Sequence, residues 1–193
     1  MRVRMRSGPA AVAIASCAVL AVVACNPVIA AAKTPPLYSS FSTNEKEQTD
    51  PQYFVDFRAR PGILVGHSYI AYGRLNARGQ LLDIHYAGIY PKDERTGLII
   101  GSVIPVRASV RAVDGDFEHA ASIIYRRKLT AAEFVRLKGA IHRERATEHY
   151  WHMLFFNCND FPIKIAKSIG LRTPPSLLVP TAFVAGLRAL NGR

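Results

Sequence analysis

The stretch His149–Gly170, HYWHMLFFNCNDFPIKIAKSIG, places Cys158 between two asparagines just before a run of apolar residues at four-residue spacing. That spacing predicts an amphipathic helix over 159–168, and Gly170 is a typical residue to end it. Cys158 then lies at the N-terminal edge of the helix. The residues around this cysteine decide whether it is packing material or a nucleophile.

The register of this helix is set by Pro162. If Asn159 is the N-cap, Pro162 is the third residue of the helix, where no backbone N–H is needed. Cys158 then lies next to free N–H groups, and the positive end of the helix dipole would stabilise a thiolate. A buried, inert cysteine is the alternative reading of LFFNC.

Upstream of this helix, four segments rich in β-branched and aromatic residues predict strands. They are 62–73, 80–90, 97–110 and 121–129. Because their connections are short, we expect an antiparallel arrangement. The predicted fold class is α+β, with an antiparallel sheet of about four to five strands packed with the helix that carries Cys158.

Two more helices are expected on the same core. Thr130 followed by Glu133 forms a capping-box pattern, and Leu129 can form a hydrophobic staple with Phe134. After the prolines at 174 and 175, the segment 180–192 predicts a short terminal helix.

The first 32 residues are typical of an export signal, because three arginines precede a small, apolar run from Pro9 to Ala24. Two cleavage sites are open. Val22–Cys25 resembles the lipobox of bacterial lipoproteins, which would leave a lipid at Cys25, and Ala30–Ala32 suits ordinary signal peptidase. The apolar run is shorter than the roughly 20 residues that a bilayer-spanning helix needs.

Residues 33–52 mix Pro, Ser, Thr and charged residues, which is typical of a flexible tether, so we expect one domain over 53–193. Export would place that domain in the periplasm or cell envelope, an oxidising compartment. Cys17 leaves with the signal and Cys25 is lipidated or removed, so Cys158 has no disulfide partner within the mature chain.

The chain is strongly basic, with a formal net charge of +11. Removing the three signal arginines leaves 22 Lys and Arg against 14 Asp and Glu, a net charge of +8. This charge favours an anionic envelope partner such as peptidoglycan peptide or lipid. Nucleic acid is not expected, because no nucleic-acid motif is present.

Histidines are the natural base for a reactive cysteine. His67 lies in the middle of a predicted strand, and His85 lies in the next one, where hairpin pairing could set it beside His67 to orient it. Asp83 would share the face of His85 and is the second choice for that role. Each histidine could instead be an ordinary strand residue.

His149 and His152 have a spacing that would suit a metal if they were helical, but no acidic residue or CxxC pattern accompanies them. No metal or other cofactor is therefore expected.

The order of these features resembles a known family. GHSYIAYG (66–73), then His85, then FNCNDF (156–161) is similar to the circularly permuted NlpC-type papain-like cysteine hydrolases, whose branch includes lecithin retinol acyltransferase-like proteins. The resemblance covers roughly 53–190. It implies Cys158 as nucleophile, His67 as general base and His85 as the polar third residue.

The expected function is an exported thiol hydrolase, an amidase or peptidase that forms an acyl-enzyme on Cys158 and acts on cell-wall peptide amides. Two alternatives stay open. One is an acyltransferase or a lipid or ester hydrolase of the same fold, and the other is an envelope ligand-binding module without activity.

Overall fold

The computed structural model describes residues 51–62 and 65–192, which all belong to one compact unit. The expected signal at 1–32 and nearly all of the expected tether lie outside these residues. Their first strand begins at Gln52, so the expected domain boundary at residue 53 falls inside it.

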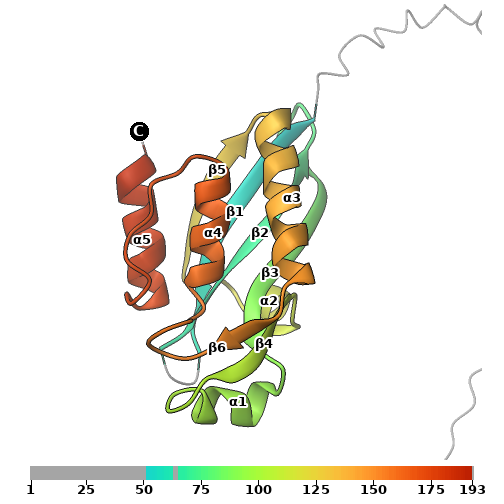
Figure 1. The fold of residues 1–193 in the computed structure, drawn as a ribbon. Helices are drawn as coiled ribbons and strands as arrows, with labels where there is room; N and C mark the ends of the chain where they lie inside the picture. The colour runs from blue at the N-terminus through green and yellow to red at the C-terminus, as the bar shows by residue number, and fades with distance from the viewer. Residues whose placement is uncertain (1–50, 63–64, 193) are drawn as a thin grey trace, which may run out of the picture. The chain divides into compact units, whose positions relative to one another are not determined.

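The described residues form one antiparallel sheet of six strands, in the order β5-β1-β2-β3-β4-β6 (Figure 1). The strands are β1 Gln52–Arg60, β2 His67–Leu75, β3 Leu81–Pro91, β4 Val106–Arg111, β5 Ile123–Leu129 and β6 His149–Trp151. Every neighbouring pair in the sheet is antiparallel, as the short connections predicted.

Five helices complete the α+β fold of the described residues: α1 Glu94–Ile100, α2 Gly115–Glu118, α3 Ala131–Ala146, α4 Asp160–Ser168 and α5 Pro180–Asn191. Figure 1 shows α3, α4 and α5 side by side over one face of the sheet. Cys158 stands immediately before α4, at the end of the sheet where β2 begins and β3 ends.

The main core lies between the sheet and these three helices. Side chains of a strand alternate between its two faces, so Val55 and Phe57 of β1 and Ile70 of β2 meet Ile165 of α4 and Phe183 of α5. Each of these side chains is fully buried or nearly so, and burial of one contributes about 1.5–3 kcal/mol. This packing fixes α4, and with it the position of Cys158, over β2.

The helix predictions are confirmed. The side chain of Thr130 accepts a hydrogen bond from the backbone N–H of Glu133, and the carboxylate of Glu133 accepts one from the backbone N–H of Thr130, which completes the capping box. Asn159 is the N-cap residue of α4. Gly170 adopts a φ of 80°, a conformation that glycine reaches without strain, and ends that helix as expected.

One strand prediction was wrong in part, and one strand was missed. The segment 97–110 was predicted as one strand, but its first part belongs to α1, where the carboxylate of Asp93 accepts a hydrogen bond from the N–H of Thr96 and starts the helix. β1 was not predicted at all. It lies inside the sheet, and its Asp56 is fully buried and paired to Arg58 and Arg126.

Within the described residues, none of the helices has the length and apolar character that crossing a bilayer requires.

Candidate functional site

Cys158 lies in the connection between β6 and α4, and only 6% of its surface is exposed. It lines a cavity of about 490 Å³ together with His67, the first residue of β2. The cavity is open at the end of the sheet beside α1. The two residues that the sequence singled out as nucleophile and base therefore share one cavity.

Most of the cavity wall is apolar. It is formed by the end of β3, by α1, by the connection between β6 and α4, and by the loop that precedes α5, with side chains such as Ile89, Leu98, Trp151, Met153 and Leu177. The polar lining residues include Asn157 and Asn159, on either side of Cys158, and His67. The site thus combines an apolar wall with a small number of reactive groups, an arrangement typical of small-ligand sites.

Asn159, the residue after Cys158, ties the helix start to the sheet. Its side-chain NH₂ group donates to the carbonyl oxygens of Ser176, at 2.8 Å, and Leu178, at 2.7 Å. Its Oδ1 must therefore be the acceptor of the 2.7 Å hydrogen bond from the hydroxyl group of Ser68. All three bonds involve an amide that is almost fully buried, so they hold Cys158 firmly.

Hydrogen bonds between its own residues also stabilise the turn that carries Cys158. The side chain of Asn157 accepts a 2.9 Å hydrogen bond from the N–H of Asn159, and the N–H of Asn157 donates at 2.7 Å to the carboxylate of Asp160. The NH₂ group of Asn157 donates to the carbonyl of Ser176 at 3.1 Å. The two asparagines flanking the cysteine therefore act as structural clamps, and the side chain of Asn159 does not cap α4.

The expected lowering of the Cys158 pKa is not what the fold produces. Burial raises the pKa of the thiol, and it outweighs the contributions of Ser68 and of the cysteine's own N–H, which lower it. The carboxylate of Asp160 raises the pKa further. The helix start supplies favourable dipoles, but removing water from the sulfur has the larger effect, so Cys158 rests as a neutral thiol.

His67 also rests in its neutral form. Burial, followed by the positive charge of Arg60, lowers its pKa from 6.5 to about 3. Its Nε2 atom is buried without a hydrogen-bond partner among the described residues. The imidazole packs at 4.4 Å, between ring centroids, against Tyr90 of β3.

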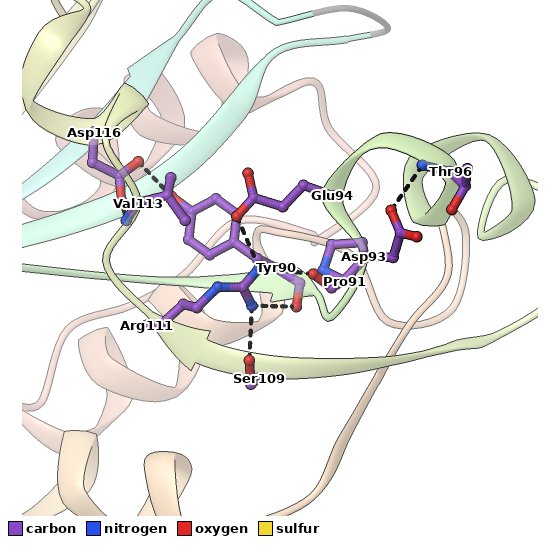
Figure 2. A network of polar contacts seen from close by, with 9 residues as sticks. All are labelled: Tyr90, Pro91, Asp93, Glu94, Thr96, Ser109, Arg111, Val113 and Asp116. Atoms are coloured by element: carbon purple, nitrogen blue, oxygen red, sulfur yellow. Dashed lines mark hydrogen bonds and ion pairs between the residues drawn. The ribbon is translucent and has the colours of Figure 1, made fainter.

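Tyr90 is held from two sides (Figure 2). Its hydroxyl group donates a short hydrogen bond to the buried carboxylate of Asp116, in α2. On the other side, Arg111 lies over the ring at 5.3 Å and donates to the Tyr90 carbonyl at 3.2 Å. The surface against which His67 packs is therefore fixed, and it lies opposite His67 in the sheet.

His67 and Cys158 are linked through the residues that follow them, since Ser68 donates its hydrogen bond to Asn159. No hydrogen bond joins His67 to Cys158 themselves, both of which lie in the described part of the chain. Ser68 faces α4, whereas the ring of His67 turns toward Tyr69 and Tyr90, because successive residues of a strand point to opposite faces.

The prediction that His85 lies beside His67 was wrong. The β2–β3 register pairs His85 with Tyr72, and Ile70 with Ala87, so continuing it three residues sets His67 opposite Tyr90. His85 is exposed at the other end of the hairpin. Asp83, the second choice, pairs with Arg74 and forms an ion pair of 2.6 Å with it.

The other two histidines considered above have structural partners. Nε2 of His149 lies 2.6 Å from the carbonyl oxygen of Glu144. Nδ1 of His152 accepts from the N–H of Leu154 at 3.1 Å, so its Nε2 donates to the carbonyl of Val103 at 3.3 Å. Within the described residues, no group of three or more His, Cys, Asp or Glu side chains is arranged to hold a metal ion.

Sequence reasoning missed Ser68, Tyr90 and Asp116 as parts of the site. Ser68 follows His67 directly, and only its hydrogen bond to Asn159 reveals its part. Tyr90 is identified by the strand register, and Asp116 comes from a short helix far along the chain. None of the three carries a spacing signal.

No protein-family model, curated protein or solved structure matches this chain.

Proposed function

We propose that this chain is an exported cysteine hydrolase, with Cys158 as nucleophile and His67 as general base. The observation that carries the proposal is the shared cavity, in which both residues are held by the hydrogen bond between Ser68 and Asn159. A buried free thiol and an imidazole that line one cavity are residue types suited to covalent acyl transfer.

The mechanism starts from a neutral thiol and a neutral imidazole. Nε2 of His67 is buried without a partner among the described residues, so the proposal assigns the role of base to Nδ1. As the sulfur attacks the acyl carbon, His67 takes the thiol proton, and it then gives that proton to the departing amine. Water attacks the resulting thioester with His67 as base, which releases the acid and restores the thiol.

The negative oxygen of the tetrahedral intermediate needs hydrogen-bond donors. The backbone N–H of Cys158 is the first candidate, because it helps to lower the pKa of the thiol. The N–H of Asn159 is not free, because it donates to the side chain of Asn157. Fewer backbone N–H groups are therefore available to bind the oxyanion at the start of α4 than at a helix end whose N–H groups are all free.

The chain order supports the permuted papain-like fold as part of this proposal. The strand that bears His67 precedes the helix that bears Cys158, and both meet at one end of an antiparallel sheet. In this reading Tyr90, supported by Asp116, takes the third position that His85 was expected to fill.

The leading substrate is an amide in cell-wall peptide, because such peptides carry carboxylates and the exported chain is basic. The second candidate is a lipid or ester acyl bond, cleaved by water or passed to another acceptor. The mostly apolar cavity wall favours this second candidate, since an acyl chain would bury apolar surface there.

The test uses the chain from Lys33 onward, which keeps every described core residue. It is incubated in parallel with purified peptidoglycan fragments and with lipid esters, as wild type and as Cys158→Ala and His67→Ala. The proposal expects turnover of one class and its loss in both variants, while His142→Ala, an exposed helix position, keeps it. Binding of a fragment without turnover in any protein would instead support a ligand-binding module.

A further inference from the structure

A band of exposed apolar side chains surrounds the mouth of the cavity. It consists of the apolar residues within 99–104, 154–156 and 177–179, which we call the apolar rim. Val103 is 78% exposed, Ile99 70%, Phe155 67% and Leu177 65%. Apolar side chains this exposed, gathered at one place, mark an interaction surface in most soluble domains.

The three segments of the rim are held against one another. The N–H of Met153 donates to the carbonyl of Gly101 at 3.1 Å, and the side chain of His152 donates to the carbonyl of Val103. Asn157 then joins the second segment to the third through the carbonyl of Ser176. The three segments therefore lie close together, and Figure 1 shows α1 and the connection that follows β6 at the same end of the sheet.

Cationic and aromatic side chains, among them Lys92, Arg107 and Tyr150, line a second hollow that shares no residue with the cavity. Lys92, which precedes α1, and Arg107, which follows α1 and the turn after it, are both exposed. The backbone N–H of Lys92 donates a 2.9 Å hydrogen bond to the carbonyl of Arg107. Tyr150, half-exposed, pairs with Arg107 across the strands. Arg107 is 3.6 Å from the exposed Glu148, a pair too open to water to neutralise it effectively.

We propose that the apolar rim docks this protein on the surface of an anionic lipid bilayer, with the mouth of the cavity facing the membrane. Exposed apolar side chains on short loops insert among lipid headgroups, and the exposed cations Lys92 and Arg107 of the second hollow attract anionic lipid. The basic charge of the whole chain adds to that attraction. A flat partner protein would instead favour a flat or grooved face.

The experiment uses the chain from Lys33 onward, so that the apolar run at residues 9–24 does not bind lipid on its own. It is sedimented with vesicles of phosphatidylcholine alone and with vesicles that also contain phosphatidylglycerol. Binding should be stronger to the anionic vesicles and should weaken as salt rises. Equal, salt-independent binding to both, or no binding to either, would overturn the proposal.

The test variant replaces the three most exposed rim residues that do not line the cavity: Ile99→Ser, Val103→Ser and Phe155→Ser. Loss of this much apolar surface should reduce the partition coefficient at least about tenfold. The matched control is Leu81→Ser, Leu82→Ser and Val135→Ser, which are also half-exposed or more but lie away from the rim, and it should bind like wild type. Equal loss in both proteins would contradict the assignment.

Lys92→Ala with Arg107→Ala separates charge from apolar contact. It should weaken binding to the anionic vesicles by about fivefold per cation and leave binding to neutral vesicles unchanged. Sedimentation velocity on the same proteins tests whether a second copy of this chain binds the apolar rim instead. A dimer in wild type that disappears in the rim variant would assign the surface to that second copy and would overturn the bilayer proposal. Because none of these readouts is turnover, they are independent of the proposed hydrolase activity.

Discussion

Ser68 of β2 donates a 2.7 Å hydrogen bond to Oδ1 of Asn159, and these are the residues that directly follow His67 and Cys158. Both side chains are buried, and the NH₂ group of Asn159 donates hydrogen bonds to two carbonyl groups in the loop before α5. One hydrogen bond thus joins the strand that carries the proposed base to the helix that carries the proposed nucleophile. Most of the expectations below depend on this link.

Ser68→Ala removes the donor and leaves Oδ1 of Asn159 buried without a partner. We expect the free energy of unfolding to fall by about 1–3 kcal/mol and turnover to fall as well, because the helix start loses its tie to β2. Urea unfolding and steady-state rates measure the two effects. Ser168→Ala is the control, since its hydroxyl group bonds only to the nearby carbonyl of Ile165. Equal losses of stability and of turnover in both variants would show that the hydrogen bond between Ser68 and Asn159 has no particular role at the site.

Gly88→Ala tests whether the position of the imidazole matters. A Cβ atom there would lie 2.9 Å from the Tyr90 ring and 3.0 Å from Nε2 of His67, so the tyrosine ring must shift and the imidazole packed against it must give way too. A shift of this size should lower kcat by about ten- to a hundredfold. The nuclear magnetic resonance signals of the His67 ring should move, because they sense the Tyr90 ring.

Gly139→Ala is the control for this glycine, because its new Cβ would meet only the end of the Arg143 side chain, at 3.5 Å. Within α3 this substitution should stabilise the fold by about 0.5–1 kcal/mol and leave kcat unchanged. An unaltered kcat in Gly88→Ala, with the ring signals displaced, would mean that catalysis does not depend on the placement of His67.

Tyr90→Phe and His85→Ala distinguish the two residues considered for the third position. Tyr90→Phe removes the hydrogen bond to Asp116 and loosens the surface that supports His67, so kcat should fall about tenfold or more with little change in KM. His85 is exposed beside Tyr72, and its loss should change kcat by no more than about twofold. A larger fall in kcat for His85→Ala than for Tyr90→Phe would instead support His85 as the third residue.

The low pKa of His67 has a consequence for acid stability. In the folded chain the ring stays neutral down to about pH 3, whereas an unfolded histidine takes up a proton below about 6.5. The unfolded state therefore binds more protons between these values, and stability is lost as the pH falls through that window, by at most about 1.4 kcal/mol per pH unit. Urea unfolding at pH 7 and pH 4 measures it.

His67→Gln removes this titration while keeping a neutral side chain of similar reach. The variant should lose less stability than wild type between pH 7 and pH 4. Parallel losses in the two proteins would show that the imidazole is accessible to protons in the folded state, contrary to its burial.

Much of the helical layer could be predicted from the sequence, because its signals are local. The capping box at Thr130, the spacing after Asn159 and the turn at Gly170 each depend on residues a few positions apart. β1 was missed because Asp56 and Arg58 interrupt its apolar pattern, and the buried carboxylate is neutralised by Arg58 of the same strand together with Arg126 of β5, which is far away in the sequence.

The candidate site could be predicted only in part. His67 and Cys158 stand out by residue type and context, and the fold brings both to one cavity. The third residue depends on strand register, which a long hairpin does not reveal: Tyr90 is 23 positions beyond His67, yet it faces that ring. The Cys158 pKa could not be predicted because desolvation depends on packing, not on the helix start alone.

The most direct test of the central claim is mass spectrometry of the chain after brief exposure to p-nitrophenyl acetate, followed by peptide mapping. We expect an acetyl group on Cys158 in wild type, none at this position in Cys158→Ala, and acylation slowed by about a hundredfold or more in His67→Ala. Acetylation confined to other residues, or of Cys158 at the same rate without His67, would contradict it.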